Sequence, residues 1–335
     1  MSNQHIIEKL WYSRSRLGWF FWPFHLFFRM IVVFKRYLYS LNIFSKNKFS
    51  KPVLVVGNIT IGGTGKTPFI NQFIKLLNKH DIRVGLVSRG YGADLKDFPH
   101  AITSTDSARR VGDEAYMQFQ DLNVCSNLNI PIVISPNRSE AVDYITNNSK
   151  VDLIISDDGL QHYKMSRDYE ILLFDGSRLF GNQLVLPFGP LREPMSRLKS
   201  IGLLIQNGGT KTTFSDNVVT LNSNCFVNLK TKEEFSLESF STKSVHAVAG
   251  IGNPQRFYDS LSTICKIKTQ KSFADHYQFK KCDFSEYGDD TVIMTEKDAT
   301  KCYSFAEDNW YYLKVEMDFG EKLSEILVRT TRKII

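Results

Sequence analysis

Hydrophobic and polar positions follow two alternating patterns along residues 52–206. Short continuous apolar runs are typical of strands buried in a parallel sheet, whereas apolar residues at i, i+3 and i+4 are typical of amphipathic helices. The pattern predicts strands at 52–57, 83–88, 132–135, 151–156, 170–174 and 201–206, and helices at 67–79, 112–120 and 137–147. Strands that alternate with helices predict βαβ units, and therefore a mostly parallel α/β sheet with helices on both faces.

A second alternation of the same kind occupies the last third of the chain. It predicts strands at 245–249, 292–295 and 310–315, and helices near 254–262, 297–303 and 320–330. Residues 207–243 lack long apolar runs and are rich in Asn, Thr, Ser and Lys. We therefore expect four parts, namely an N-terminal arm (1–50), a larger α/β core (51–206), a linker region (207–243) and a smaller C-terminal α/β domain (244–335).

The N-terminal arm contains an apolar run at residues 17–34, which Pro23, His25 and Arg29 interrupt. A helix that crosses a bilayer needs about 20 mostly apolar residues, and a charge near its centre is costly. We therefore expect a helix that lies in the membrane interface, with aromatic side chains at the acyl boundary and basic side chains near anionic headgroups. A helix packed into the protein's own core and a true membrane span are the alternatives.

Charge is distributed unevenly along the 335 residues. Residues 1–51 contain nine basic residues and one acidic residue, whereas the remaining 284 residues contain 33 basic and 34 acidic residues. The formal charge of +7 thus belongs to the arm, and a basic nucleic-acid footprint spread over the body is excluded. The five cysteines show no CxxC spacing, so neither a disulfide framework nor a zinc site is indicated.

The most specific motif directly follows the strand at 52–57 and directly precedes the helix at 67–79. It has the composition of a phosphate-binding loop, in which small residues let backbone N–H groups surround phosphate oxygens at a helix N-terminus. Lys66 is expected to reach the β- and γ-phosphates, and the Thr67 hydroxyl is expected to ligate Mg²⁺. Thr60 stands where the usual motif has glycine. The predicted nucleotide-binding residues are Thr60, Ile61, Gly62, Gly63, Thr64, Gly65, Lys66 and Thr67.

Acidic residues follow two of the predicted elements. Asp157 and Asp158 come directly after the strand at 151–156, where a phosphate-loop site needs a carboxylate for its metal. Asp113 and Glu114 open the helix at 112–120, and taken alone they fit helix capping. Further polar residues on connecting segments could bind an anionic or sugar substrate, and they are Arg89, Tyr91, Arg138, His162 and Arg192.

Taken together, these segments resemble the tetraacyldisaccharide 4′-kinase family of lipid A biosynthesis. The resemblance spans roughly residues 50–300. It includes threonine at position 60, where the usual phosphate-binding loop has glycine. It is carried by VGNITIGGTGKTP (56–68), SRGYG (88–92), VGDEA (111–115), DDGLQH (157–162), LPFGPLREP (186–194), AGIGNPQRF (249–257), FADHYQF (273–279) and TEKDATK (295–301). It implies two α/β/α domains with the active site between them.

The resemblance also implies an activity and its participants. The enzyme would transfer the γ-phosphate of ATP, with Mg²⁺, to the 4′-hydroxyl of an acylated glucosamine disaccharide 1-phosphate, giving lipid IVA at the cytoplasmic face of the inner membrane. Asp113 would activate the hydroxyl with His276 as its partner, because a hydroxyl needs a positioned base near neutral pH. Glu114, Asp157 and Asp158 would lie on the metal side. Arg89, Tyr91, Arg138, His162 and Arg192 would form the lipid headgroup site.

Two functions from other classes remain alternatives at this stage. One is a membrane-tethered P-loop GTPase switch, for which Thr295-Glu-Lys-Asp298 comes close to the guanine-specifying signature but has Glu where Lys is required. The other is an ATPase coupled to transport or assembly, for which a water-positioning residue cannot be identified. The sequence leaves the oligomeric state open.

Overall fold

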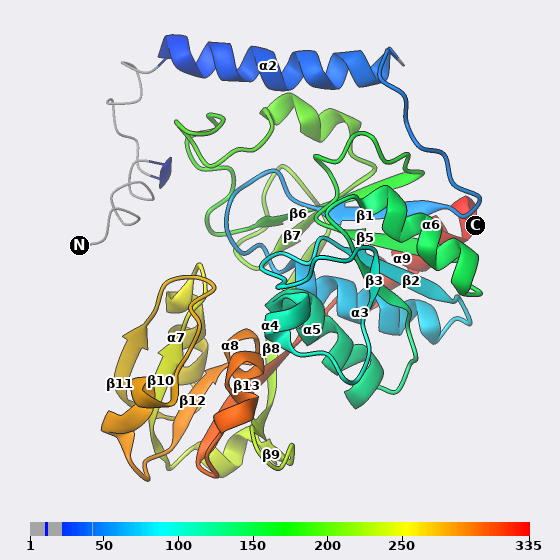
Figure 1. Ribbon diagram of the computed structural model, residues 1–335. Helices are drawn as coiled ribbons and strands as arrows, with labels where there is room; N and C mark the ends of the chain where they lie inside the picture. The colour runs from blue at the N-terminus through cyan, green and yellow to red at the C-terminus, as the bar shows by residue number, and fades with distance from the viewer. Residues whose placement is uncertain (1–10, 13–21, 42) are drawn as a thin grey trace.

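The computed structural model describes residues 11–12, 22–41 and 43–335, which form two lobes joined by a pair of long strands (Figure 1). Residues 17–21 of the predicted apolar run lie outside the described residues, as does most of the arm before them. The first lobe contains α3 (Lys66–Asn78), α4 (Ala108–Val111), α5 (Asp113–Phe119), the π-helical η2 (Gln120–Cys125), α6 (Arg138–Asn148), the 3₁₀ turn η3 (Met195–Ser200) and the C-terminal α9 (Gly320–Ile334).

The sheet of the first lobe is parallel except at one edge. Its strands are β1 (Val53–Gly57), β2 (Val84–Ser88), β3 (His100–Ala101), β4 (Ile132–Ile134), β5 (Leu153–Asp157), β6 (Tyr169–Asp175) and β7 (Leu203–Asn207). They are arranged in the order β3-β4-β2-β5-β1-β6-β7, and β3 alone of these runs antiparallel to its neighbour. The chain moves from β1 to one side of the sheet and later to the other, so a crevice for ligands is expected at the carboxyl end of β1.

Alternating side chains of β1 supply both faces of this sheet. Leu54 and Val56 pack into a core with α3, α5 and α9, whereas Val53 and Val55 pack into a second core with α6 and η3. All four side chains are almost completely buried, as expected for a central parallel strand covered on both sides. The predicted α/β sheet with helices on both faces is therefore confirmed.

The second lobe repeats this layering on a smaller scale. It contains β8 (Val218–Asn228), β9 (Glu234–Ser236), η4 (Leu237–Phe240), β10 (Ser244–Ala249), α7 (Pro254–Ser262), β11 (Lys266–Ser272), η5 (Lys281–Tyr287), β12 (Val292–Thr295), α8 (Glu296–Cys302), η6 (Tyr303–Phe305) and β13 (Trp310–Asp318). Its strand order is β11-β10-β12-β13-β8, with β9 paired to β8. α7 covers one face and α8 covers the other.

The structure differs from the sequence prediction in the region between the lobes. Residues 207–243 were predicted as a linker, yet they contain the eleven-residue strand β8, which pairs with β7 at one end and with β13 along its length. β8 alternates half-buried and exposed positions through its middle, so its polar residues hide the strand pattern. α9, predicted within the C-terminal domain, packs on the first lobe through Leu323 and Leu327.

The N-terminal helix α2 (Trp22–Ser40) lies along the outside of the first lobe (Figure 1). His25 on its inner side is buried, and its Nδ1 accepts a hydrogen bond from the Val185 backbone at 3.3 Å. Arg36 donates to the Ser200 hydroxyl at 3.0 Å, which fixes the other end of the helix. Within the part of the chain that the structure describes, none of the helices combines the length and hydropathy needed to cross a bilayer.

Candidate active site

The predicted phosphate loop connects the carboxyl end of β1 with the N-terminus of α3. Gly65 caps α3 with a φ of 82°, a left-handed conformation that glycine adopts without a steric penalty. A Cβ atom at this position would lie 2.2 Å from Nδ2 of Asn207. Glycine is therefore required by the backbone conformation and by the close approach of Asn207, and the loop leads into a helix N-terminus that favours anions.

Contacts on both sides hold this loop in place. Asn207 Nδ2 donates to the Thr64 carbonyl oxygen at 3.0 Å, and Asn58 Nδ2 lies 3.4 Å from both the Gly62 carbonyl oxygen and Thr64 Oγ1. Thr60 forms an antiparallel bridge with Leu191 of the segment that follows β6. The loop is thus fixed by residues that lie far from it in the sequence.

The two aspartates lie beside the loop, as the sequence predicts. β5 pairs with β1 so that Asp157 is opposite Val56, which places its carboxylate near the start of the loop. Asp157 is buried, and Gln118 Nε2 donates to its Oδ2 at 3.2 Å, but its Oδ1 has no hydrogen-bond partner among the described residues. Burial raises the pKa of Asp157 to about 7.

Asp158 faces the cations of the site. Its Oδ1 lies 3.6 Å from Lys66 Nζ, and its Oδ2 accepts a hydrogen bond from Arg192 Nη1 at 2.8 Å. Burial acts to raise the pKa of Asp158, but the charges of Lys66 and Arg192 outweigh burial, so the pKa lies below its ordinary value. Asp158 therefore remains a carboxylate next to the loop lysine.

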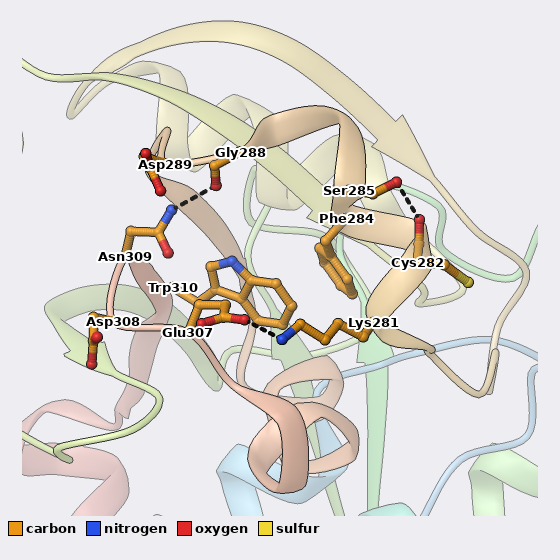
Figure 2. Close-up of a pocket in the computed structure, with 10 residues that line it drawn as sticks. All are labelled: Lys281, Cys282, Phe284, Ser285, Gly288, Asp289, Glu307, Asp308, Asn309 and Trp310. Carbon is orange, nitrogen blue, oxygen red and sulfur yellow. Dashed lines mark hydrogen bonds and ion pairs between the residues drawn. The ribbon is translucent and has the colours of Figure 1, made fainter.

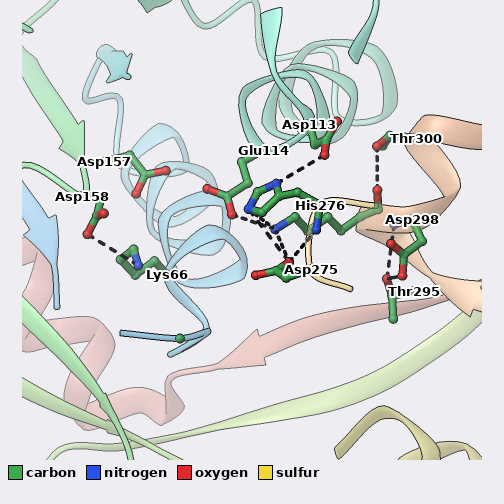
Figure 3. Close-up of polar contacts among 12 residues, drawn as sticks. Lys66, Asp113, Glu114, Asp157, Asp158, Asp275, His276, Thr295, Asp298 and Thr300 are labelled. Carbon is green, nitrogen blue, oxygen red and sulfur yellow. Dashed lines mark hydrogen bonds and ion pairs between the residues drawn. The ribbon is translucent and has the colours of Figure 1, made fainter. Parts of the chain in front are cut away.

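Asp113 and His276 meet across the two lobes (Figure 3). Asp113 is the first residue of α5, and His276 comes from the loop between β11 and η5, with a φ of 61°. Its Nδ1 lies 3.5 Å from Asp113 Oδ2, and the Tyr91 ring lies 5.1 Å from the imidazole, measured between ring centroids. The structure thus brings together the two residues that the family resemblance pairs.

Two lysines of α8, which are not among the predicted site residues, complete this cluster. Lys297 Nζ lies 3.1 Å from Glu114 Oε1 and 3.3 Å from His276 Nε2. Lys301 is almost completely buried, and its Nζ lies 3.1 Å from Asp298 Oδ1 and 3.7 Å from Asp113 Oδ2. Their spacing of four residues places both on one helix face, and this was the available signal for a shared role.

The partners of His276 favour one tautomer of its ring. Nδ1 faces the carboxylate of Asp113, so this nitrogen is suited to carry the proton. Nε2 faces the ammonium group of Lys297, which can only donate a hydrogen bond. The tautomer with its proton on Nδ1 satisfies both neighbours, because it directs the imidazole N–H toward Asp113 and leaves Nε2 to accept from Lys297.

The predicted substrate-binding residues differ in their environments. Arg138 is buried and donates to the carbonyl oxygens of Asp157 and Asp158, both at 2.9 Å, so it supports the end of β5. Burial lowers the pKa of Arg138 and lowers that of His162 to about 4. Arg89 and Tyr91 are exposed just beyond β2. Contact of these residues with substrate stays a prediction.

The predicted metal ligands form a looser group. Thr67 lies in the first turn of α3 next to Lys66, whose Nζ lies 3.6 Å from Asp158 Oδ1, while Glu114 is paired with Lys297. Across residues 11–12, 22–41 and 43–335, no three His, Cys, Asp or Glu side chains gather closely enough to hold a metal ion by themselves. The metal assignment therefore stays a prediction.

A separate pocket of about 500 Å³ lies in the second lobe (Figure 2). η5 and the start of β13 form it, and it shares no residue with the cluster described above. The lining residues are Lys281, Cys282, Phe284, Ser285, Gly288, Asp289, Glu307, Asp308, Asn309 and Trp310. Its position assigns it no part in the chemistry at the phosphate loop.

Comparison with known proteins relates nearly the whole chain to one family. A family model described as tetraacyldisaccharide-1-P 4′-kinase matches residues 17–332. A tetraacyldisaccharide 4′-kinase of Legionella pneumophila (strain Corby) is 44% identical over 320 residues, covering 95% of both chains. One of Haemophilus influenzae (strain 86-028NP) is 42% identical over 313 residues, covering 93% of this chain and 92% of the relative.

A solved structure shows the same architecture. It is the crystal structure of the "apo" form of LpxK from Aquifex aeolicus in complex with ATP, with a TM-score of 0.75 and 27% sequence identity. The match covers 94% of this chain and 99% of the other. The two-lobed arrangement is therefore shared with a protein that binds ATP.

Proposed function

We propose that this chain, which belongs to the tetraacyldisaccharide-1-P 4′-kinase family, transfers the γ-phosphate of ATP at the junction of its two lobes. It is a kinase, and its acceptor is the 4′-hydroxyl of an acylated glucosamine disaccharide 1-phosphate. The observation that carries this proposal is the 3.5 Å approach of His276 to Asp113 beside the phosphate loop of Lys66.

Each side chain of the cluster has a separate role in phosphoryl transfer. Asp113 accepts the proton of the acceptor hydroxyl as the hydroxyl oxygen bonds to the γ-phosphorus, while the bond from that phosphorus to the β–γ bridging oxygen breaks and ADP leaves. His276 orients Asp113. Lys301, whose Nζ lies 3.7 Å from Asp113 Oδ2, holds a buried positive charge beside this carboxylate. Lys66 and the backbone N–H groups of the loop stabilise the charge on the phosphoryl oxygens. Approach of the two lobes would exclude water and so limit ATP hydrolysis.

The chemistry of the site fits a magnesium ion. The buried Asp157 Oδ1 lacks a hydrogen-bond partner among the described residues, and an unsatisfied buried carboxylate oxygen is suited to a hard cation. We assign Asp157, Asp158, Glu114 and the Thr67 hydroxyl as the groups that would hold Mg²⁺ directly or through water. The ion would neutralise charge on the β- and γ-phosphate oxygens when bound.

We assign the lipid headgroup to the polar residues at the same edge of the sheet. Arginine suits a 1-phosphate because its planar guanidinium can donate two parallel hydrogen bonds. Arg89 and Tyr91 are exposed, so both can meet a ligand in that region, whereas Arg138 and Arg192 already contact the aspartate pair. His162 lies in the segment that follows this pair and completes the proposed headgroup site.

We further propose that α2 binds the cytoplasmic face of the inner membrane. The helix exposes large apolar side chains that a water-facing helix would not carry, and such patches mark interaction surfaces. They continue into the residues after the helix, and they are Phe24, Leu26, Phe27, Phe28, Met30, Ile31, Val33, Phe34, Tyr37, Leu41, Ile43 and Phe44. An acceptor embedded in lipid requires an enzyme at this interface.

The alternatives from other classes lose support. The segment nearest to a guanine-specifying signature has a structural role, because Thr295 caps α8 and Asp298 Oδ2 accepts from the Gly250 backbone at 2.8 Å. An ATPase coupled to transport would turn over ATP without the acylated acceptor.

The direct test supplies the purified protein with labelled ATP and the disaccharide 1-phosphate in detergent. We expect label in a doubly phosphorylated lipid, loss of that product in Lys66→Ala, and normal product in Lys79→Ala, which removes an exposed lysine at the other end of α3. Unchanged transfer by Lys66→Ala contradicts the proposal, and acceptor-independent ATP turnover at the same rate favours the ATPase.

A further inference from the structure

Arg256 connects the second lobe with the first. It lies in the first turn of α7, and its Nη2 donates to Oδ1 of Asn207 at 3.1 Å, while its Nη1 lies 3.8 Å from Asp175 Oδ2. Asn207 ends β7 and Asp175 ends β6, so one guanidinium spans the carboxyl ends of two adjacent strands. Neither Arg256 nor Asn207 belongs to the site predicted from the sequence.

Asn207 uses both ends of its side-chain amide. Its oxygen accepts from Arg256, and its Nδ2 donates to the Thr64 carbonyl oxygen of the phosphate loop at 3.0 Å. A guanidinium can only donate and a carbonyl oxygen can only accept, so these two partners determine which end of the amide faces which way. The result is a continuous polar connection from α7 to the loop.

Two further close approaches surround the phosphate loop. Asn207 of the first lobe fills the space where a side chain at Gly65 would lie. A Cβ atom at Gly252, in the turn before α7, would lie 4.0 Å from the Gly63 backbone nitrogen and 3.4 Å from Asp275 Oδ2. This turn therefore lies between the phosphate loop and the residue next to His276.

We propose that Arg256 is a positioning residue for phosphoryl transfer, which acts through Asn207 on the Thr64–Gly65 part of the phosphate loop. The connection makes the conformation of the loop depend on the position of the second lobe, which also carries His276. Arg256 thus links the placement of the phosphates to the placement of the Asp113 partner. This inference rests on the proposed function, because it takes the loop as the site of the ATP phosphates.

The test measures kcat and the KM for ATP in Arg256→Met, Asn207→Asp and the double variant. Asn207→Asp keeps oxygens that accept from Arg256 but removes the donor to Thr64. Gln255→Ala is the matched control, because Gln255 neighbours Arg256 on α7 and bonds only to Asp259 among the described residues. We expect each single variant to lower kcat/KM for ATP roughly tenfold to a hundredfold, and the double variant to be little worse than either.

Two results would overturn the inference. One is an Arg256→Met enzyme with the kinetics of Gln255→Ala, and the other is a double variant whose losses multiply. If Arg256→Met fails to fold in a thermal melt, Arg256→Lys is measured instead, where a loss in kcat/KM without a change in Tm supports the inference and unaltered kinetics reject it. Transfer that survives in Lys66→Ala would count against the proposed function rather than against Arg256.

Discussion

His276 Nδ1 lies 3.5 Å from Asp113 Oδ2, although the two residues are supplied by different lobes. On the far side of the ring, Nε2 faces Lys297 at 3.3 Å, so the imidazole is held between an anion and a cation. The reacting carboxylate is therefore oriented only when the second lobe is in place.

Replacing His276 with Ala should lower kcat far more than it changes the KM for ATP. The ring contacts Asp113 and not the phosphate loop, so we expect a loss of about 10²- to 10⁴-fold in kcat, the usual range for a group that assists proton transfer. Steady-state kinetics with both substrates would measure it, with His80→Ala at the exposed end of α3 as control. A raised KM with normal kcat would assign His276 to binding.

Replacing Gly112 with Ala should disturb both stability and catalysis. Gly112, the residue directly before Asp113, has a φ of 92°. A Cβ atom added at Gly112 would lie 2.5 Å from the Tyr91 carbonyl oxygen. We expect a loss of about 1–3 kcal/mol in the free energy of unfolding, together with a lower kcat.

Gly288→Ala is the control for Gly112→Ala, because it separates the effect of backbone strain from the effect of a steric clash. Gly288 has a φ of 50°, but nothing lies within 4 Å of the added Cβ. Urea unfolding should show a smaller loss in Gly288→Ala, with kcat unchanged. Equal losses of stability in the two variants would show that the contact with Tyr91 is unimportant.

His162 should make the fold less stable as the pH falls from about 6.5 to about 4. Burial, reinforced by the charges of Arg138 and Arg167, lowers the pKa of His162 from 6.5 to about 4. In this window the unfolded chain binds a proton that the folded protein does not, so stability falls with pH and is fully retained above 6.5.

His162→Gln should remove the pH-dependent loss in the free energy of unfolding that His162 causes, which is on the order of 2 kcal/mol. Urea unfolding of both proteins at pH 7 and pH 4.5 gives the comparison, with the exposed His80→Gln as control. If wild type and His162→Gln lose the same free energy of unfolding between the two pH values, burial of the neutral ring is not the cause.

Charges placed on the outer side of α2 should weaken membrane binding. Phe27 and Phe34 are 57% and 61% exposed, and burial of such a side chain contributes roughly 1.5–3 kcal/mol. The double variant Phe27→Glu/Phe34→Glu should reduce cosedimentation with phosphatidylglycerol-containing vesicles by at least about tenfold. Tyr144→Glu on α6 should bind normally, and quantitative release of the wild type by high salt alone would contradict hydrophobic insertion.

Much of the first lobe could be predicted because its central strands are continuous apolar runs. β1 and β5 are buried on both faces, so hydrophobicity alone defines them. β8 and β11 were missed for the opposite reason, since exposed polar residues interrupt their patterns. A strand that lies between lobes or at a sheet edge pairs its backbone without burying every side chain.

The residues of the candidate site also differ in whether the local sequence could predict them. The phosphate loop and Asp157 could be predicted because each directly follows a recognisable strand. Asp113 and His276 depended on family resemblance, because no local pattern reports a contact between distant segments. Lys301, Asn207 and Arg256 were missed because their roles arise from the way the lobes meet, and each residue type is ordinary in its local sequence.

The β8–β13 pair has a geometric consequence for the whole enzyme. Thr220 is paired with Asp318 near the first lobe, and Asn228 is paired with Tyr311 at the other end, so the second lobe is the enlarged connection of a single antiparallel hairpin. A slip of one residue in that register would shift one strand along the other by about 3.4 Å. This shift is about the same as the 3.5 Å distance between His276 Nδ1 and Asp113 Oδ2. The strand register therefore determines how far the second lobe extends toward the first.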